Sequence, residues 1–494
     1  MLESGPRGQP FSNIVIVGAS GDLAQKKIIP SLFALRSQGF LPSPFRVFGF
    51  GRTAMTDEEF RRRCVEHLTC RYVPGESCAA HMERFLADCH YVEGRYEAPE
   101  SFLDLYQKMK DVEGSIEPRS IFYLAIPPSI FVEVSQALGA SGLVRCGEGS
   151  ENARVVVEKP FGRDRASFDA MDRALGQVFS EDQVYRIDHY LGKEVVRNLL
   201  VLRFANYIFE PLWSRDHVRS VEIVWKEDIG VEERGRYFDE YGIIRDVMQN
   251  HLLQILALVA MERPESLNAN AIKNAKLAVL RSIAPLGTED LVVGQYHGKG
   301  TGGDARPSYT AEKYVAPNSI TPTYAAAVLR VDSARWRGVP FLMRAGKGLD
   351  SRVTEIRMRF RPVSGELFGQ FIKDLRGNEL VVRVQPDEGL YFRIVNKVPA
   401  VRMQLAETDL DLRYKAAFQS LIPDAYEYLL LDIVHGDRSL FIRRDELAAA
   451  WDIFTPALHE LERRATRPDP YVLGTAGPSG VKSLMERYAM DDPQ

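Results

Sequence analysis

The chain contains 494 residues, 45% of them hydrophobic and 26% charged, a composition typical of a globular protein with about two to four domains. Its 63 basic and 67 acidic side chains leave a formal net charge of -4, so no global field draws it to nucleic acid or to an anionic membrane. No stretch approaches the roughly 18 uncharged apolar residues that span a bilayer. We therefore expect neither nucleic acid nor a membrane as a partner, and any anion site must be a local cluster of cations.

Neither end of the chain carries a recognisable targeting signal. Residues 1–10 lack the apolar run of a secretory signal, and residues 491–494 match no peroxisomal or endoplasmic-reticulum address. We expect a cytoplasmic protein, with an organelle address read by other means left open.

The cysteine pattern indicates reduced thiols. The cysteines are odd in number and form no C-x-x-C pair, which is common in a reducing compartment. They are Cys64, Cys70, Cys78, Cys89 and Cys146. A zinc site that also uses His81 or His90 is the alternative, but the spacing matches no known ligand pattern, so we expect no metal.

Short apolar runs alternate with helical segments in the first part of the chain. The runs 13–17, 45–50, 121–126 and 154–157 suit strands that are buried on both faces of a parallel sheet. Segments 26–36, 57–70 and 101–110 are typical of helices, with Pro30 tolerated only near a helix start. This alternation predicts a Rossmann-like, doubly wound α/β domain with a parallel sheet, which we place at residues 11–190.

The pattern changes in the rest of the chain. Residues 354–360 and 221–226 alternate between apolar and charged side chains, which is typical of strands with one buried and one polar face. We expect a larger α+β domain with a broad, mainly antiparallel sheet over residues 191–494, and a loop over the Gly-rich residues 293–306. A sheet face left uncovered offers a subunit interface, and we expect a homodimer or homotetramer.

A short glycine turn follows the first predicted strand and opens a helix. The turn is G-x-x-G rather than the full G-x-G-x-x-G fingerprint, and it consists of Gly18, Ala19, Ser20, Gly21, Asp22 and Leu23. Glycine lets the backbone approach a pyrophosphate, and the helix N-terminus supplies N–H donors. A purely structural turn explains the glycines equally well.

Arg52 follows the second predicted strand. An NAD site favours an acidic residue at this place, for the ribose 2′-hydroxyl, whereas an arginine suits the 2′-phosphate of NADP. A solvated surface arginine is the alternative, but the preceding glycine turn favours an NADP site.

Two further polar segments follow buried strands. Lys159 follows a Val-rich strand and precedes Pro160, and ligands of open α/β sheets bind beyond the carboxyl ends of strands. A lysine that ends a strand in water is the alternative, and the sequence leaves the isomer of Pro160 open. In the second segment, His189, Tyr190 and Lys193 converge at a predicted strand-to-helix turn. Such a turn offers a phosphate dianion one full charge and several donors, although a surface turn is the alternative.

The helical segment 241–261 is apolar almost all round and is predicted to be buried. Burying its Asp246, Asn250 and His251 costs several kcal/mol unless each is hydrogen-bonded. By itself, His251 is explained as well by a structural hydrogen bond as by catalysis.

Five strings in the chain resemble the signatures of glucose-6-phosphate dehydrogenases. The run Arg-Ile-Asp-His-Tyr-Leu-Gly-Lys-Glu at 186–194 resembles the active-site signature of this family. The other strings lie at 18–24, 158–163, 242–251 and 383–386, and the resemblance extends from about Asn13 to about Tyr471. The family consists of nicotinamide-dependent oxidoreductases that open the pentose phosphate pathway.

The resemblance implies a role for each candidate residue. His251 is then the general base that takes the proton of the sugar C1 hydroxyl, and Asp188 orients its imidazole. Lys159 lies between sugar and nicotinamide, and the coenzyme site runs from Gly18 to Leu23 and includes Arg52. The remaining substrate contacts are the phosphate-binding His189, Tyr190 and Lys193, the sugar-binding Glu227 and Asp246, and Lys347 and Arg352.

Some members of the family hold a second, structural NADP in the antiparallel domain. Arg344, Arg357, Arg383 and Tyr391 match the pattern of that site. Val353 and Ala476 stand where basic residues are expected, so we expect no tight second NADP.

The resemblance implies oxidation of D-glucose 6-phosphate at C1 to 6-phospho-D-glucono-1,5-lactone with NADP+ as hydride acceptor, the activity classed as EC 1.1.1.49. A neutral imidazole, with an ordinary pKa of about 6.5, suits proton abstraction near neutral pH. The alternatives are a dehydrogenase of free glucose or another hexose phosphate, and a non-catalytic NADP-binding sensor. A sensor has no need of Asp188, Lys159 and His251, and all three are present.

Overall fold

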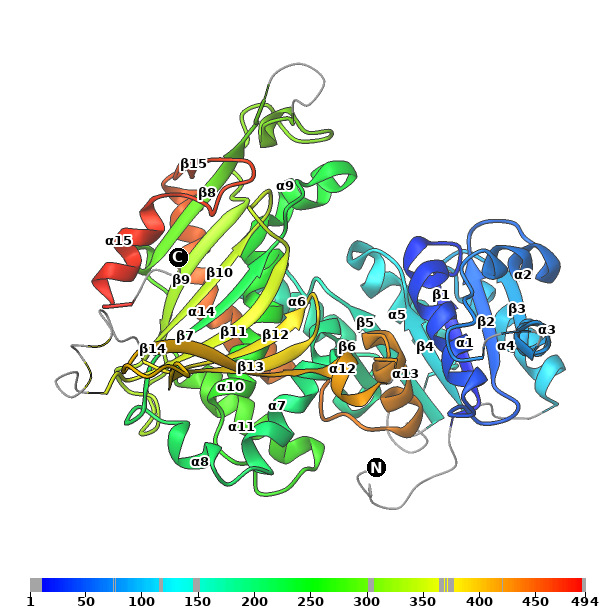
Figure 1. Ribbon diagram of the computed structural model, residues 1–494. Coiled ribbons are helices and arrows are strands. Elements are labelled where there is room, and N and C mark those ends of the chain that lie inside the picture. The colour runs from blue at the N-terminus through cyan, green and yellow to red at the C-terminus, as the bar shows by residue number, and fades with distance from the viewer. Residues whose placement is uncertain are drawn as a thin grey trace. The chain divides into compact units, whose positions relative to one another are not determined.

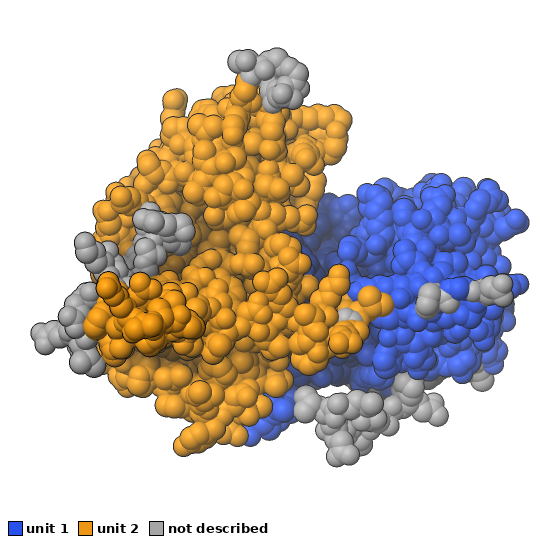
Figure 2. All heavy atoms as spheres, in the orientation of Figure 1, with its two compact units in different colours: residues 1–193, 265–273, 423–448 blue, residues 194–264, 274–422, 449–494 orange. Residues whose placement is uncertain are grey.

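The computed structural model describes residues 11–73, 75, 77–114, 119–144, 152–300, 306–363, 368, 371, 377–419 and 421–490. They divide into two compact units, which Figure 2 shows in different colours. Unit 1 comprises residues 1–193, 265–273 and 423–448, and unit 2 comprises 194–264, 274–422 and 449–494. Two segments from the later part of the chain thus belong to the first unit.

Unit 1 contains a six-stranded parallel sheet in the order β3-β2-β1-β4-β5-β6 (Figure 1). The strands are β1 Asn13–Val17, β2 Arg46–Gly51, β3 Cys89–Glu93, β4 Ser120–Leu124, β5 Ala153–Glu158 and β6 Val184–Ile187. Every residue of β1 and β4 is buried, as expected for continuous apolar runs with helices on both faces. The predicted doubly wound α/β domain is confirmed.

The helices of unit 1 connect these strands. They are η1 Ala24–Ile28, α1 Ile29–Ser37, α2 Asp57–Val65, α3 Ser77–Ala87, α4 Pro99–Glu113, η2 Pro128–Ile130, α5 Phe131–Ala140, α6 Arg165–Gly176, η4 Glu181–Gln183, η5 His189–Gly192 and α13 Ala425–His435. Pro30 is the second residue of α1, which follows directly on the π-helix η1, so its missing N–H falls at the junction of the two helical segments. Helix α13 contributes Leu429 and Ile433 to the same core as β1 and α1, which explains why residues 423–448 belong to unit 1.

Unit 2 is built on a nine-stranded sheet in the order β14-β13-β12-β11-β7-β10-β9-β8-β15 (Figure 1). The strands are β7 Val218–Lys226, β8 Leu291–His297, β9 Tyr324–Arg330, β10 Pro340–Gly346, β11 Val353–Phe360, β12 Glu379–Gln385, β13 Gly389–Lys397, β14 Leu405–Arg413 and β15 Asp469–Val472. Among the described strand pairs of this sheet, only β7/β10 and β8/β15 are parallel. The predicted α+β domain with a broad, mainly antiparallel sheet is confirmed.

The helices of unit 2 include the segment that carries the candidate base. The bounds are α7 Glu194–Phe204, α8 Phe209–Leu212, η6 Glu232–Arg234, α9 Gly235–Ile243, η7 Ile244–Leu252, α10 Leu253–Ala260, η8 Thr288–Asp290, η10 Tyr309–Ala311, α12 Tyr414–Phe418, α14 Arg444–Arg463 and α15 Gly480–Arg487, with α11 Ala269–Arg281 shared between the units. Helix η7 contacts β7 and β10, and α7 contacts β12. In Figure 1, α7, α10 and α11 lie on one side of the large sheet.

Two predictions about local structure are wrong. Residues 293–297 belong to strand β8 rather than to a loop, and residues 301–305 of the predicted loop lie outside the described residues. The predicted single helix over 241–261 is interrupted, because Gly242 has φ 67° and ψ 170° and the chain then forms the π-helix η7. Glycine tolerates that conformation without a Cβ clash, and the side chain pattern alone did not distinguish a π-helix from an α-helix.

The prediction of reduced thiols is also wrong for two cysteines. Cys70 and Cys78 form a disulfide, with Cα atoms 5.8 Å apart. Helix α3 begins at Ser77 and brings Cys78 back to Cys70, an approach that neither the odd count nor the spacing revealed. Cys64 and Cys89 are buried free thiols, and burial raises the pKa of Cys64 to about 12. Cys146 lies outside the described residues.

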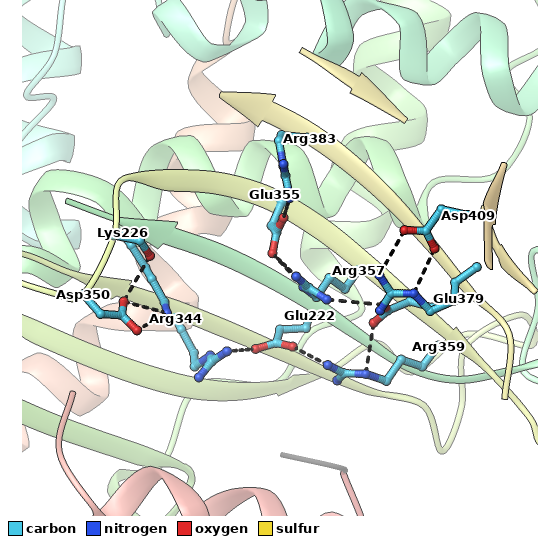
Figure 3. A network of polar contacts seen from close by, with 12 residues as sticks. Glu222, Lys226, Arg344, Asp350, Glu355, Arg357, Arg359, Glu379, Arg383 and Asp409 are labelled. Atoms are coloured by element: carbon cyan, nitrogen blue, oxygen red, sulfur yellow. Dashed lines mark hydrogen bonds and ion pairs between the residues drawn. The ribbon is translucent and has the colours of Figure 1, made fainter. Parts of the chain in front are cut away.

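The polar face of the large sheet carries a network of ion pairs between arginine and glutamate side chains (Figure 3). Glu222 on β7 is fully buried and pairs with Arg344 on β10 and with Arg359 on β11. The ion-pair network continues through Glu379, Arg357, Glu355 and Arg383. The sequence predicted a polar face here, but the carboxylates at its centre are covered by the long arginine side chains rather than by water.

Two guanidinium groups determine the charge state of Glu222. Burial by itself raises its pKa, but Arg344 and Arg359 offset this effect and lower the pKa below the ordinary value. The Glu222 carboxyl group is therefore expected to be ionised throughout the neutral range.

We predict that Glu222→Gln lowers the free energy of unfolding of unit 2 by about 3–5 kcal/mol, because it removes a fully buried carboxylate from the buried Arg344 and the partly buried Arg359. Thermal melting at pH 7 measures this effect. Since the folded pKa is depressed, the wild-type advantage is present above the ordinary pKa of 4.5 and disappears as the pH falls further. Asp409→Asn is the control: its ion pair with Arg393 is partly exposed and contributes less than about 1 kcal/mol. Equal losses of stability in the two variants would contradict the prediction.

Candidate functional site

The candidate residues of unit 1 follow the carboxyl ends of its strands. Gly18 follows β1, Arg52 follows β2, Lys159 follows β5 and Asp188 follows β6. Because all neighbouring strands in this sheet are parallel, these ends form one edge. Ligands of open α/β sheets bind beyond that edge.

Gly18 is required by the geometry of the turn. It has φ +92°, and a Cβ atom added there would lie 2.4 Å from the carbonyl oxygen of Ala125. Its N–H donates to the carbonyl oxygen of Phe50 (2.8 Å), so the turn lies directly against the neighbouring strand β2. The backbone of this turn thus approaches its neighbours more closely than any side chain allows.

The rest of the turn leads into the N-terminus of a helix. The Gln25 side chain donates to the carbonyl oxygen of Ala19 (2.7 Å), and the Gly21 N–H donates to that of Gly18 (3.0 Å). The helix begins at Asp22, so the amides of Asp22 and Leu23 belong to its first turn, where an N–H has no intrahelical acceptor. This cradle fits a pyrophosphate.

Arg52 lies beside the same turn. The Thr53 hydroxyl contacts the Ser20 hydroxyl at 3.4 Å, which brings the ends of β1 and β2 together. The Arg52 guanidinium is exposed and lies over the Tyr96 ring, 5.2 Å from its centroid. An exposed guanidinium beside a pyrophosphate cradle fits the 2′-phosphate of NADP.

Lys159 and Asp188 lie on neighbouring strands. Glu158, the last residue of β5, is paired with Ile187 of β6, so the next residues are Lys159 and Asp188. The Lys159–Pro160 peptide is cis, and Lys159 is partly exposed at the sheet edge. Asp188 is buried, and its carboxylate accepts the N–H of Tyr190 (3.0 Å), which caps η5.

Helix η5 brings the predicted phosphate-binding residues together. The rings of His189 and Tyr190 meet edge to face with centroids 4.9 Å apart, and Lys193 Nζ lies 5.6 Å from the centroid of the Tyr190 ring. The Tyr426 ring of α13 is stacked on His189, with centroids 6.5 Å apart. An imidazole, a phenol and an ammonium on one turn can all donate to a phosphate.

Unit 2 brings Glu227 and Lys347 together. Each follows a strand, β7 and β10 respectively, and these strands are parallel neighbours. Lys347 Nζ donates to Glu227 Oε2 (2.5 Å), and the Tyr471 hydroxyl donates to the carbonyl oxygen of Lys347 (2.6 Å). Arg352 is exposed and precedes β11, whose Val353 pairs with Lys226, so Arg352 lies near the same strand end.

The three predicted polar residues of η7, Asp246, Asn250 and His251, are buried. The Tyr237 hydroxyl donates to Asp246 Oδ1 (3.3 Å), and burial together with this carboxylate raises the pKa of Tyr237. Asn250 donates to the carbonyl oxygen of Arg245 (3.0 Å) and accepts the N–H of His251 (2.6 Å). His251 itself is almost fully buried on the helix that contacts β7 and β10.

Sequence reasoning missed three aromatic residues of these clusters. Tyr237 contacts Asp246, Tyr426 is stacked on His189, and Tyr96 supports Arg52. Tyr237 lies nine residues before Asp246, so its position near the helix was a usable signal. Tyr426 has no such signal, because more than two hundred residues separate it from His189.

Arg383 and Tyr391, two of the four residues that match the second NADP site, line a cavity of about 250 Å³ on β12–β14. Arg383, Tyr391 and Arg393 contribute to its wall, but so do the carboxylates of Asp409 and Asp411. Arg393 is paired with Asp409 and Arg413 with Asp411, so these arginines are already neutralised by carboxylates and attract a polyphosphate less strongly. That the chain holds no tight second NADP stays a prediction.

Within the described residues, no helix has the length and apolar character needed to cross a membrane. The chain matches two family models: glucose-6-phosphate dehydrogenase, NAD binding domain, at residues 15–198, and glucose-6-phosphate dehydrogenase, C-terminal domain, at residues 200–491.

Curated relatives and solved structures agree with these matches. The chain is 52% identical over 490 residues to the chloroplastic glucose-6-phosphate 1-dehydrogenase 1 of Arabidopsis thaliana, covering 98% of this chain and 84% of the relative. It is 44% identical to the cytoplasmic glucose-6-phosphate 1-dehydrogenase 5 of the same plant, covering 96% and 91%. A solved glucose-6-phosphate dehydrogenase in complex with its substrate glucose-6-phosphate is 38% identical, with a TM-score of 0.91 and coverage of 99% and 100%.

A glycine cradle and an arginine at the carboxyl edge of a doubly wound sheet, joined to an α+β unit, define a nicotinamide-dependent oxidoreductase. The comparisons narrow this class. The chain belongs to the glucose-6-phosphate dehydrogenase family, which confirms both the predicted enzyme class and NADP as its cofactor.

We predict that Gly18→Ala weakens NADP binding at least about tenfold, because its Cβ displaces the Ala125 carbonyl and distorts the cradle. Gly39→Ala is the matched control: Gly39 also has positive φ (+76°), but nothing lies within 4 Å of an added Cβ. Both variants lose about 1–2 kcal/mol from the left-handed backbone, and the clash with Ala125 lowers the melting temperature of Gly18→Ala further. Only Gly18→Ala changes the Kd for NADP measured by fluorescence titration, and equal Kd values in both variants would contradict the role of the turn.

Proposed function

We propose that this chain oxidises D-glucose 6-phosphate at C1 to 6-phospho-D-glucono-1,5-lactone, with NADP+ as hydride acceptor, as the first step of the pentose phosphate pathway. The observation that carries the proposal is the similarity, over 99% of the chain, to a solved glucose-6-phosphate dehydrogenase in complex with its substrate. The clusters of unit 1 and unit 2 supply the residue types that this reaction needs.

In this proposal, residues 11–190 bind NADP and residues 191–494 supply substrate contacts and the subunit interface. His189, Tyr190 and Lys193 bind the 6-phosphate, and their contacts on η5 support this role. Glu227, Asp246, Lys347 and Arg352 contact the sugar, and the Glu227–Lys347 ion pair supports joint action of two of them.

The proposed chemistry removes two hydrogens, one from C1 and one from its hydroxyl group. His251 takes the hydroxyl proton as C1 becomes a carbonyl, and Asp188 stabilises the resulting imidazolium and fixes the ring orientation. When bound, NADP+ supplies the acceptor for the C1 hydride. Lys159 lies at the sheet edge between the sugar and nicotinamide positions and orients both. The burial of His251 and Asp188 supports this assignment, because buried partners hold a fixed geometry.

We further propose that the chain forms a homodimer or homotetramer in the cytoplasm. Strand β14 is an edge of the large sheet and exposes Leu410, which supports pairing of that sheet with a second copy. The relatives' names include a chloroplastic and a cytoplasmic protein.

We predict that His251→Asn lowers kcat at least about 100-fold, the usual contribution of a general base, while the Kd for NADP stays unchanged. NADPH absorbance measures the rate. The control is His297→Asn, which changes an exposed histidine at the end of β8. If Asp188 acts only through His251, the double variant with Asp188→Asn and His251→Asn has nearly the same kcat as His251→Asn alone. A kcat lowered by the product of the two single effects would contradict their pairing. Normal turnover by His251→Asn would overturn the base assignment.

We predict that Lys193→Ala lowers kcat/KM for glucose 6-phosphate at least about tenfold, the usual value of a charge-assisted hydrogen bond, and leaves activity on free glucose unchanged. Parallel assays with the two sugars measure the difference. Lys313→Ala, which removes an exposed lysine paired with Glu233, is the matched control. Equal losses on both sugars would contradict the role of Lys193 in binding the phosphate.

A further inference from the structure

Glu158 ends strand β5, and two tyrosine hydroxyls from separate elements reach its carboxyl group. Tyr123 on β4 donates to Glu158 Oε1 at 2.6 Å, and Tyr426 on α13 donates to the same oxygen at 3.1 Å. Both tyrosines are buried. Burial, and then the Glu158 carboxylate, raise the pKa of each tyrosine, so both hydroxyls keep their protons and act as donors.

The charges around Glu158 are those of the proposed active site. Lys159 is the next residue, and Asp188 follows the residue with which Glu158 pairs on β6. Burial raises the pKa of Glu158 to about 7, although Tyr123, Tyr426 and Lys159 each lower it and Asp188 raises it further. The titratable groups that act most strongly on this carboxyl thus come from β4, from α13, from the residue after β5 and from the residue after β6.

Tyr426 connects Glu158 to the phosphate-binding cluster. Its hydroxyl donates to Glu158, and its ring is stacked on His189 with an angle of 8° between the planes. The helix that carries it lies close to η5, because a Cβ added at Gly192 would lie 2.6 Å from the carbonyl oxygen of Ala425. The Glu158 carboxylate therefore lies at the end of β5 and is connected to His189 of η5 through the ring of Tyr426.

We propose that Glu158 is a positioning residue for the reaction: its ionised carboxylate, held by Tyr123 and Tyr426, orients Lys159 and fixes the His189 side of the phosphate-binding cluster. The inference rests on the proposed function, since it assigns Glu158 a role in that same site. When the carboxyl group takes up a proton, the negative charge beside Lys159 disappears and the two tyrosine donors face a weaker acceptor. Positioning is then lost at acid pH and present above neutral pH.

The titration of Glu158 can be tested on stability alone. The raised pKa means that the folded state holds a proton that the unfolded state has released, so wild-type stability falls as the pH rises from about 4.5 through about 7. Glu158→Gln has no proton to lose. We expect its melting temperature, measured relative to the wild type, to increase between pH 5 and pH 8. A difference in melting temperature that stays constant between pH 5 and pH 8 would contradict the titration of Glu158 in this range.

The kinetic test compares Glu158 with a second carboxylate, Glu427, which lies on α13. Glu427 is a matched control: it accepts the Tyr72 hydroxyl at 2.7 Å, burial also raises its pKa, and it neighbours Tyr426 along the chain without adjoining Lys159. We expect wild-type kcat/KM for glucose 6-phosphate to exceed that of Glu158→Gln about tenfold at pH 8–9, the usual value of charge-assisted hydrogen bonds. The ratio of wild-type to Glu158→Gln kcat/KM falls towards one at pH 6, and the pH midpoint of this change lies near 7. The corresponding ratio for Glu427→Gln stays near one at every pH.

Each outcome decides between a positioning role and a structural one. A Glu158→Gln ratio that does not change with pH, whatever its size, overturns the inference while wild-type turnover leaves the proposed function intact. A wild type that does not reduce NADP+ with glucose 6-phosphate overturns both. If Glu158→Gln does not fold, Tyr426→Phe keeps the carboxylate and removes one donor. We then expect KM for glucose 6-phosphate to rise more than kcat falls, and an unchanged KM would overturn the inference.

Discussion

The parallel arrangement of six strands is the constraint on which the candidate site depends. Because every neighbouring pair from β3 to β6 is parallel, their carboxyl ends lie at one edge. That edge carries Gly18, Arg52, Lys159 and Asp188, which are widely separated in sequence. Each strand needs buried apolar residues on both faces, so only the residues after each strand are left to serve a ligand. The fold thus gathers the candidate coenzyme and substrate contacts from segments that are distant in sequence.

The nature of the partners decides the charge of Glu222 and of Glu158. Glu222 and Glu158 both lose water, which raises the pKa of a carboxyl group. Glu222 faces the guanidinium groups of Arg344 and Arg359 and has a lowered pKa, so its charge supports the sheet. Glu158 faces mainly neutral hydroxyls, and its pKa is raised towards neutrality. A carboxyl group held this way responds to pH in the neutral range, whereas one held by arginines does not.

The sequence predicted the elements whose pattern is local. The apolar runs of β1, β4 and β5, the alternation of β11 and the glycine turn at Gly18 each arise from constraints within a few residues, and the structure confirms them. Several features required contacts distant in sequence. The disulfide depends on how α3 returns to Cys70, and the burial of Glu222 depends on arginines from two other strands. The π-helix η7 follows an interruption at Gly242 that a helical apolar pattern does not reveal.

By itself, the sequence determined the fold class, the family and the types of residue available for chemistry, because periodicity, turn glycines and long signature strings are written in consecutive residues. Only the tertiary structure decided which side chains meet within each unit. Tyr426 reaches Glu158 and His189, and Lys347 reaches Glu227, across separations of 120 residues or more. Such contacts follow from strand order and helix packing, and the burial that accompanies them determines whether a carboxyl group near the site is charged.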